Sequence, residues 1–304
     1  MIDVNEVTKR YGGTTAVDRL TFRVRPGRVT GFLGPNGAGK TTTLRIILGL
    51  DAPTGGTATV GGRPFRERPR GLRHVGALLD AHDVHGGRSG RAHLAALARG
   101  NRIPRARVDE VLAEVGLESA AGRRVAGYSL GMKQRLGIAT ALLGDPPVLV
   151  FDEPLNGLDP EGVLWVRGLF RRLAAEGRTV FVSSHLMAEM EHTAEDLVVI
   201  GRGALIAAET VRDFAARGTA TTVTVRTPAA TRLAPLLAAE GGRVTAAEDG
   251  DVLSVTGLPA ARIGELAFHD GVMLQELATR STSLEDAFLE LTAGSGAYLA
   301  GEAR

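Results

Sequence analysis

Hydrophobic residues in the first two-thirds of the chain gather in short runs that alternate with stretches of helical spacing. Two of these runs, 148–151 and 179–182, are apolar almost throughout, as expected of strands covered on both faces of a sheet. A further strand-like run at 28–33 is followed by helical spacing over 42–48. This alternation of strands and helices predicts an α/β domain over residues 1–210.

Helical patterns dominate the middle of this predicted domain. Apolar residues recur at helical spacing within 91–99 and again within 105–115. Strand-like runs stand on both sides of this stretch. We therefore expect a helical subdomain, at about 81–135, inserted into the α/β core.

Beyond position 210 the order of predicted elements is β-α-β-β-α-β, which is the order of a ferredoxin-like fold. The turn Glu248–Asp251, between two short apolar runs, predicts a hairpin. Thr282 and Glu285 have the spacing of a capping box and predict a last helix, with a frayed tail from Gly294 onward. Residues 211–304 thus predict a small α+β accessory domain. The predicted strands are 221–226, 244–245, 252–255 and 272–277, and the predicted helices are 231–240, 259–268 and 284–291.

Composition narrows the class of protein. The 304 residues include 36 basic and 34 acidic side chains and no cysteine, which excludes disulfides, thiolate metal sites and cysteine nucleophiles. With 4% aromatic residues and no basic stripe, we expect no nucleic-acid partner. The arginines between Arg63 and Arg73 predict a solvated loop, with contact to anionic lipid or a protein partner as the alternative.

The first residues do not have the basic and then apolar pattern of a signal sequence. No apolar run approaches the ~18 residues that a membrane-spanning helix needs. We therefore expect a soluble, intracellular protein unless a membrane-bound partner holds it.

Residues 34–41 carry the strongest chemical signal, a complete Gly-x-x-x-x-Gly-Lys-Thr phosphate loop between a predicted strand and a predicted helix. Backbone N–H groups of such a loop point at phosphates, and the helix N-terminus adds positive partial charge. Lys40 can reach the β- and γ-phosphates of a nucleoside triphosphate, and the Thr41 hydroxyl can bind Mg²⁺. The alternative is a chance match in a chain with 40 glycines, but the flanking elements also agree. The other predicted phosphate contacts are Asn36, Gly37, Ala38, Gly39 and Thr42.

Two further strands end in residues that suit hydrolysis. Asp152 follows the strand 148–151 and is expected to hold Mg²⁺, directly or through water. Glu153 is placed to polarise a water molecule for attack on the γ-phosphorus. His185 follows the next predicted strand and can hydrogen-bond the γ-phosphate, because ligands bind at the carboxyl ends of such strands. The alternatives are a solvated acidic edge and a surface histidine.

A second anion site is predicted where Tyr128–Arg135 opens a helix. Ser129 and Gly131 stand at the start of that helix, where N–H groups bind anions. Because one subunit does not need two triphosphate sites, we expect this second anion site to close over the ligand held by a second subunit.

Together these segments resemble the ATP-binding subunit of an ABC transporter, over about residues 2–210. The resemblance implies a P-loop NTPase cassette with a RecA-like core, in which 34–42 is similar to Walker A and 148–153 to Walker B with its catalytic glutamate. By the same resemblance, Tyr11 stacks on adenine, Asp159 belongs to the D-loop, and His185 is the switch histidine. Residues 128–132 take the place of the signature Leu-Ser-Gly-Gly-Gln.

Two positions depart from this family pattern. Leu130 stands where the signature has its first glycine, and Met132 where it has glutamine. Asp80 stands where the Q-loop usually has glutamine; a carboxylate there could still meet Mg²⁺ through water, although its geometry and charge differ.

The resemblance implies an ATPase that works as a homodimer and drives a separate integral-membrane permease from the cytoplasmic face of the membrane. The segment 284–292 resembles the closing helix of bacterial drug-exporter ATPases, so export of a hydrophobic drug or antibiotic-like compound is the leading hypothesis for the substrate. The main alternative is a soluble ABC-type ATPase that acts on ribosomes or nucleic acid. A phosphoryl-transfer kinase would have no use for Ser129 or His185.

Overall fold

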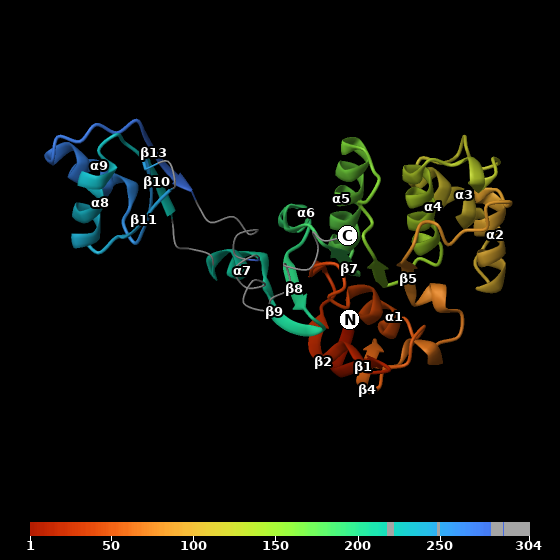
Figure 1. Cartoon of the computed structure of the whole chain (residues 1–304). Helices are drawn as coiled ribbons and strands as arrows, with labels where there is room; N and C mark the ends of the chain where they lie inside the picture. Colours follow the sequence, from red (N-terminus) through yellow and green to blue (C-terminus); the bar gives the residue numbers. More distant parts are fainter. Residues whose placement is uncertain (218–221, 248–249, 281–287, 289–304) are drawn as a thin grey trace. The chain divides into compact units, whose positions relative to one another are not determined.

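The computed structural model describes residues 1–217, 222–247, 250–280 and 288. The chain forms two compact units, Met1–Val211 and a second that starts at Arg212 (Figure 1). The last predicted helix, apart from Phe288, its capping pair Thr282 and Glu285, and the predicted tail lie outside the described residues. Each unit is described by itself below.

The first unit is built around a six-stranded sheet with the strand order β5-β6-β7-β3-β8-β9. Its strands pair in parallel from β5 to β8, and β9 joins antiparallel to β8. The strands predicted at 28–33, 148–151 and 179–182 are confirmed, and all three are almost entirely buried. The bounds are β3 Arg28–Leu33, β5 Val75–Leu78, β6 Val148–Phe151, β7 Thr179–Ser184, β8 Asp196–Gly201 and β9 Ala204–Thr210.

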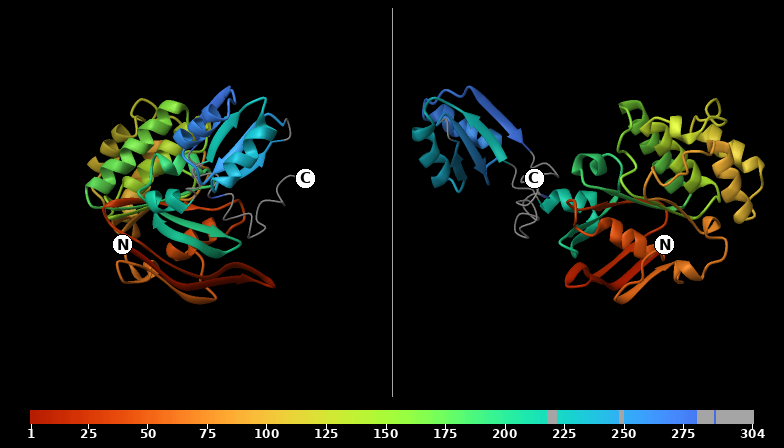
Figure 2. Two further views of the ribbon diagram at one scale, coloured as in Figure 1. Left: turned by 90° about the vertical axis from the view of Figure 1, so that its left-hand side faces the viewer. Right: turned by 45° about the vertical axis from the view of Figure 1, so that its right-hand side comes forward.

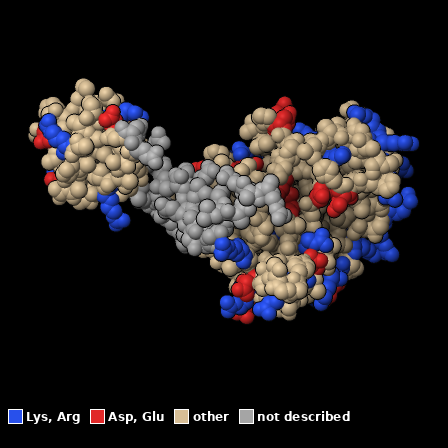
Figure 3. Space-filling model, in the orientation of Figure 1, with Lys and Arg blue, Asp and Glu red and all other residues tan. Residues whose placement is uncertain are grey.

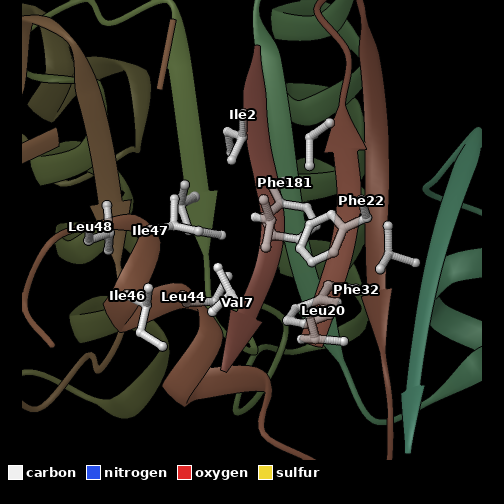
Figure 4. Close-up of a cluster of buried hydrophobic side chains, with 14 of the residues drawn as sticks. Ile2, Val7, Leu20, Phe22, Phe32, Leu44, Ile46, Ile47, Leu48 and Phe181 are labelled. Carbon is white, nitrogen blue, oxygen red and sulfur yellow. The ribbon is translucent and has the colours of Figure 1, made fainter. Parts of the chain in front are cut away.

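A second, antiparallel sheet with the order β2-β1-β4 covers one side of this core. Between the two sheets, the rings of Phe22, Phe32 and Phe181 lie with their centroids 5.1–5.8 Å apart (Figure 4). Ile2 and Leu44 extend the same buried cluster toward helix α1. This packing fixes α1, and therefore the loop before it, on the sheet. The bounds are β1 Ile2–Tyr11, β2 Thr14–Val24, β4 Gly55–Val60 and α1 Lys40–Ile47.

The predicted helical stretch is present as three helices that lie together at one side of the first unit (Figure 2). Ser89 and Ser129 begin two of them, and each side chain accepts a hydrogen bond from the N–H three residues on, the usual N-cap contact. These helices are α2 Gly90–Gly100, α3 Ala106–Glu114 and α4 Leu130–Leu142. Two others, α5 Pro160–Ala175 and α6 Met187–Glu191, and the 3₁₀ turns Phe65–Glu67, Gly71–Arg73 and Val125–Gly127 complete the unit. In the part of the chain that the structure describes, no helix is both long and apolar enough to cross a bilayer.

After α7, the described residues of the second unit have the element order β-α-β-β-α-β, as expected from the sequence. Its antiparallel sheet has the order β11-β12-β10-β13, and α8 and α9 pack with it around a common core. In chain order this is 2-3-1-4, the arrangement of the split β-α-β fold. The bounds are α7 Val211–Arg217, β10 Thr222–Arg226, α8 Ala230–Ala239, β11 Arg243–Ala246, β12 Val252–Thr256, α9 Ala260–His269 and β13 Glu276–Arg280.

The last strand of this sheet differs from its prediction at 272–277, because β13 begins only at Glu276. Gly271 ends α9 with a φ of 61°, and Val272 N donates a hydrogen bond back to Ala267 O at 2.8 Å. Val272 is therefore apolar because it covers the end of the helix. Pairing with β10 starts after Gln275 N bonds to Arg226 O.

The first unit has a hydrophobic core of its own, so we expect it to fold without the second. A chain ended after Arg217 should keep a cooperative thermal unfolding transition and bind ATP with an affinity within about threefold of the full chain. Circular dichroism during heating and equilibrium binding of a fluorescent ATP analogue would check this. Loss of the transition would show that the C-terminal part stabilises the first unit.

Candidate nucleotide-binding and hydrolysis site

The phosphate loop lies between the end of β3 and the start of α1. Gly37 and Gly39 have φ values of 79° and 99°, which favour glycine. A Cβ on Gly39 would lie 2.5 Å from Ala16 O, whereas one on Gly37 would meet nothing within 4 Å, so the loop is open on that side. The first helical hydrogen bond runs from Thr43 N to Gly39 O. The N–H groups of residues 40–42 therefore precede the helical ladder and are available to an anion.

Lys40 lies inside this loop, with only 6% of its side chain exposed. Its Nζ donates to Gly34 O at 2.6 Å and lies 3.5 Å from Glu153 Oε1. A buried ammonium group needs such partners. Phosphate oxygens bound in the loop would replace Gly34 O as the partner of Lys40 Nζ. Because these oxygens are charged, they bind the ammonium group more strongly than the carbonyl does.

Thr41 and Asp152 meet beside the loop. Thr41 Oγ1 donates to Asp152 Oδ2 at 2.7 Å, and Ser183 donates to the other carboxylate oxygen, Oδ1. A hydroxyl and a carboxylate at one point are ligands that suit Mg²⁺, which usually takes one or two protein oxygens and fills its other positions with phosphate oxygens and water. The residues therefore fit a Mg²⁺–nucleotide complex. The described residues contain no cluster of three or more histidine or acidic groups that would make a dedicated metal site.

Glu153 is the most connected residue of the site. Its Oε2 lies 2.9 Å from His185 Nδ1, and its Oε1 faces Lys40. Its backbone has a φ of 48°, which costs a residue other than glycine on the order of 1 kcal/mol or more. Ser183 Oγ accepts a hydrogen bond from Glu153 N at 2.9 Å, and Gln134 Nε2 donates one to Glu153 O at 3.0 Å. These two bonds hold the strained backbone.

Tyr11 ends β1 with 49% of its surface exposed. Its hydroxyl donates to Asp51 at 3.2 Å, and Arg45 donates to the same carboxylate oxygen at 2.9 Å. Lys9 Nζ lies 4.8 Å from the centre of the ring. Loss of hydration and the bond to Asp51 raise the pKa of Tyr11. The ring is thus held in one orientation, with exposed surface on which a base could stack.

The structure brings the predicted signature and D-loop segments together. Ser129 Oγ accepts from Met132 N at 3.2 Å as the N-cap of α4, and the nearest atom to a Cβ on Gly131 would be Gly157 O. A Cβ on Gly157 would overlap the Leu130 side chain. Leu130, the departure from the family signature, therefore occupies the space that Gly157 leaves open. Asp159 is exposed and caps α5 by accepting from Gly162 N at 3.0 Å.

Asp80 is exposed and its carboxylate belongs to a local turn. Its Oδ1 accepts from His82 N at 2.7 Å and lies 3.1 Å from His82 Nδ1. The hydrogen bond from His82 N is the main reason that the pKa of Asp80 is lowered. These contacts direct Asp80 to its own loop, and its role as a nucleotide contact stays a prediction.

Sequence reasoning missed Gln134, Ser183 and Asp51. Gln134 stands five residues beyond Ser129 on α4, and its side chain is buried against the loop at Glu153. Ser183 lies two residues before His185, so its place on a strand end could have drawn attention to it. Asp51 gave no signal, because it meets Tyr11 only in the folded chain. Tyr128, which stood within the predicted signature, is a buried anchor whose hydroxyl donates to Ala120 O at 2.7 Å.

Comparison with known proteins agrees with this geometry. A family profile described as "ABC transporter" matches residues 17–156, and one described as "Domain of unknown function (DUF8746)" matches residues 221–285. The uncharacterised ABC transporter ATP-binding protein YhcH of Bacillus subtilis is 41% identical over 216 residues, which cover 70% of this chain and 71% of YhcH. The bacitracin transport ATP-binding protein BcrA of Bacillus licheniformis is 41% identical over 209 residues, 68% of each chain. A solved dimeric bacterial ABC transporter cassette, MJ0796, superposes with a TM-score of 0.65 and 25% identity, over 70% of this chain and 99% of the cassette.

The chain belongs to the family of ATP-binding subunits of ABC transporters. The P-loop cassette fold expected from the sequence is confirmed, and the α4 helix and the Glu153 loop lie in the first unit together with the phosphate loop. The chain is therefore an ATPase of the ABC transporter family, whose ATP-binding subunits work with membrane permeases. Cassettes of this family bind ATP and form dimers.

Lys40→Ala tests the assignment of the phosphate loop. Because Lys40 is the buried cation of the loop, its removal should weaken ATP binding by about a hundredfold, as expected for loss of a charge-assisted contact to phosphate. Isothermal titration calorimetry with ATP would measure the affinity, and thermal unfolding would show that the variant is folded. Unchanged affinity in a folded variant would contradict the assignment.

Proposed function

We propose that this chain hydrolyses Mg²⁺–ATP to energise export of a hydrophobic drug or antibiotic-like compound, as a homodimer bound to a permease at the cytoplasmic face of the membrane. The observation that supports it most is the meeting of Lys40, Glu153 and His185 at the ends of three adjacent parallel strands. No such convergence is needed for the stability of the sheet. It is what hydrolysis of a triphosphate requires.

Nucleotide binding is assigned to the phosphate loop, to Tyr11, and to the oxygens of Thr41 and Asp152. Lys40 and the N–H groups of residues 36, 37 and 39–42 hold the phosphates, while Ala38 N donates to Pro35 O at 3.1 Å within the loop. The exposed ring of Tyr11 stacks on adenine. Mg²⁺ on Thr41 and Asp152 would supply neutralising charge to the phosphates. Ser183 keeps Asp152 oriented through its bond to Oδ1.

Hydrolysis is assigned to Glu153 and His185. Glu153 takes a proton from a water molecule, whose oxygen attacks the γ-phosphorus while the bond to the bridging oxygen of ADP breaks. His185 donates through Nδ1 to the Glu153 carboxylate, so its other ring nitrogen can donate to the γ-phosphate only in the imidazolium form, in which both ring nitrogens carry a proton. The pair thus orients the water and the phosphate with respect to each other. The products are ADP and phosphate.

A second copy of the chain would complete each site. Ser129 and Gly131 lie at the N-terminus of α4, where their contacts are with α4 itself and with the loop at Gly157. Ser129 is exposed, so an anion can approach this helix end from outside. Two copies placed face to face would let Ser129 of each close over the ATP of the other, and the similarity to the dimeric MJ0796 cassette supports this arrangement. ATP then shifts the population toward the closed dimer.

The permease is proposed to bind a groove between the sheet and the helical layer. The groove has a volume of about 490 Å³, and its lining is mostly apolar, with Asp80 and Asp83 among its polar residues. Leu50, which lines it, is 57% exposed, so the apolar lining reaches the surface, where a partner can contact it. Basic side chains, drawn in blue for lysine and arginine, gather along the outer edge of the helical part (Figure 3). The apolar lining residues are Leu48, Leu50, Phe65, Leu72, Val75, Ala77, Leu78, Leu79, Val84 and Leu97.

The class of transported compound is proposed from relatives alone. BcrA is a bacitracin transport protein, and the chain covers more than two-thirds of it at 41% identity. Bacitracin is an antibiotic, so export of an antibiotic-like compound is the extension we make. The cassette determines that ATP is hydrolysed and that the dimer closes, while the permease selects the transported compound.

Glu153→Gln tests the catalytic assignment. Replacing the carboxylate removes the general base and should lower hydrolysis by about a hundredfold or more while ATP still binds. Phosphate release would measure turnover, and light scattering with ATP should show a persistent dimer. Glu176→Gln, which changes an acid at the end of α5 that pairs with Arg178, is the control and should hydrolyse ATP normally. Undiminished turnover in Glu153→Gln would remove Glu153 as the base.

Leu50→Asp tests whether the groove binds the permease. The same experiment tests the alternative function, a soluble ABC-type ATPase that acts on ribosomes. Leu50 is exposed, so the change should leave folding and basal ATP hydrolysis intact. Sedimentation of the tagged chain with membranes from the cells that express it should fall about tenfold in the variant, because a charge would be buried in the apolar contact. Sedimentation with ribosomes in place of membranes would favour the soluble ABC-type ATPase.

A further inference from the structure

Gln134 is a buried polar residue to which neither the sequence motifs nor the proposed mechanism assigns a role. It lies on α4, five residues after Ser129, and only 5% of its surface is exposed. Its side-chain partner is the backbone oxygen of Glu153, 3.0 Å from Nε2. Because the acceptor is a carbonyl, the group that faces it is the NH₂ group of the amide.

The residue that it holds has an unusual backbone. Glu153 has a φ of 48°, in the left-handed region that favours glycine. Hydrogen bonds hold both of its peptide groups: Glu153 N donates to Ser183 Oγ at 2.9 Å, and Glu153 O accepts from Gln134. Such a conformation persists only where its surroundings hold it. Asn156 N also donates to Glu153 O, at the longer distance of 3.3 Å, so without Gln134 the peptide after Glu153 would keep only this weaker bond.

The two holding residues come from different layers of the first unit. Ser183 lies on β7 of the sheet and is fully buried. Gln134 lies on the helix whose first turn contains Ser129. The carboxylate of Glu153 therefore depends on the sheet on one side and on the helical layer on the other.

We propose that Gln134 is a positioning residue that keeps Glu153 in the geometry for hydrolysis and makes that geometry depend on the position of α4. The proposal rests on the proposed function, because it assumes that Glu153 activates water and that Ser129 meets the nucleotide of a second copy. A shift of α4, such as closure of the dimer would produce, changes the Gln134–Glu153 bond. Engagement of the nucleotide of one site is thereby transmitted to the catalytic carboxylate of the other.

Gln134→Met is the direct test in the full-length protein. Methionine has nearly the length and volume of glutamine but cannot donate a hydrogen bond. We expect kcat for ATP hydrolysis to fall about tenfold, while KM and the affinity for ATP change less than about threefold. This split separates positioning of Glu153 from a loss of nucleotide binding.

Arg107→Met is the matched control. Gln134 donates from α4 to the Glu153 loop, whereas Arg107 Nη2 donates to Leu142 O at the far end of α4, at 3.2 Å. Arg107→Met therefore also removes a side-chain bond that involves α4, together with the exposed pair of Arg107 with Glu110. Its kcat should stay within about twofold of the wild type. If both variants lose kcat equally, the effect is a general loosening of α4 and the proposal is wrong.

Gln134→Leu covers the case in which the methionine variant does not fold. Leucine also cannot donate a hydrogen bond, so the same loss of kcat is expected. Normal kcat in either folded variant would overturn the proposal.

The combination with Glu153→Gln tests whether Gln134 acts through Glu153. Single-turnover hydrolysis of the double variant should equal that of Glu153→Gln alone, because residues that act as one unit are not additive. A further tenfold loss would show that Gln134 acts elsewhere. If the wild type itself neither binds nor hydrolyses ATP, the proposed function fails and this inference with it; if the wild type hydrolyses ATP and Gln134→Met behaves like Arg107→Met, only the inference fails.

Discussion

Parallel pairing of β6, β7 and β3 is the constraint on which the site depends. Leu33 pairs with Ser184, and Phe151 pairs with Val182, so the phosphate loop, the Asp152–Glu153 pair and His185 all follow at the same edge of the sheet. A slip of one residue in this register would turn every side chain to the opposite face. The strands are buried on both faces, so packing against both layers fixes the register.

The features that the sequence could predict are those that a local pattern decides. Neighbouring residues are enough to recognise apolar runs, a glycine loop, and strands that end in acidic residues or histidine. Because ligands bind at the carboxyl ends of parallel strands, the residues after these strands are then expected to lie together at one edge of the sheet. The misplaced start of β13 shows the limit. Val272 and Leu274 are apolar because they pack in the core after α9, and a pattern of apolar residues does not distinguish that role from a strand.

What could not be predicted is set by contacts between distant segments. Tyr11 is oriented by Asp51, forty residues away, and Asp80 is turned toward its own loop by the N–H of His82. Leu130 and Gly157 show the same dependence, because the larger side chain in the signature is accommodated only where the facing loop has none. In the sequence, neither Leu130 nor Gly157 indicates that the other residue provides or fills the space between them.

The contact between Lys40 and Glu153 links nucleotide binding to the surroundings of the Glu153 carboxylate. In the structure, Lys40 divides its charge between Gly34 O and the Glu153 carboxylate. The phosphates of ATP are stronger acceptors than either, so they would draw Lys40 away and leave Glu153 with His185 and the attacking water. In the proposed function, ATP thus separates the Glu153 carboxylate from Lys40 before the water attacks. The order of binding before hydrolysis then follows from the competition of phosphate and carboxylate oxygens for one buried ammonium group.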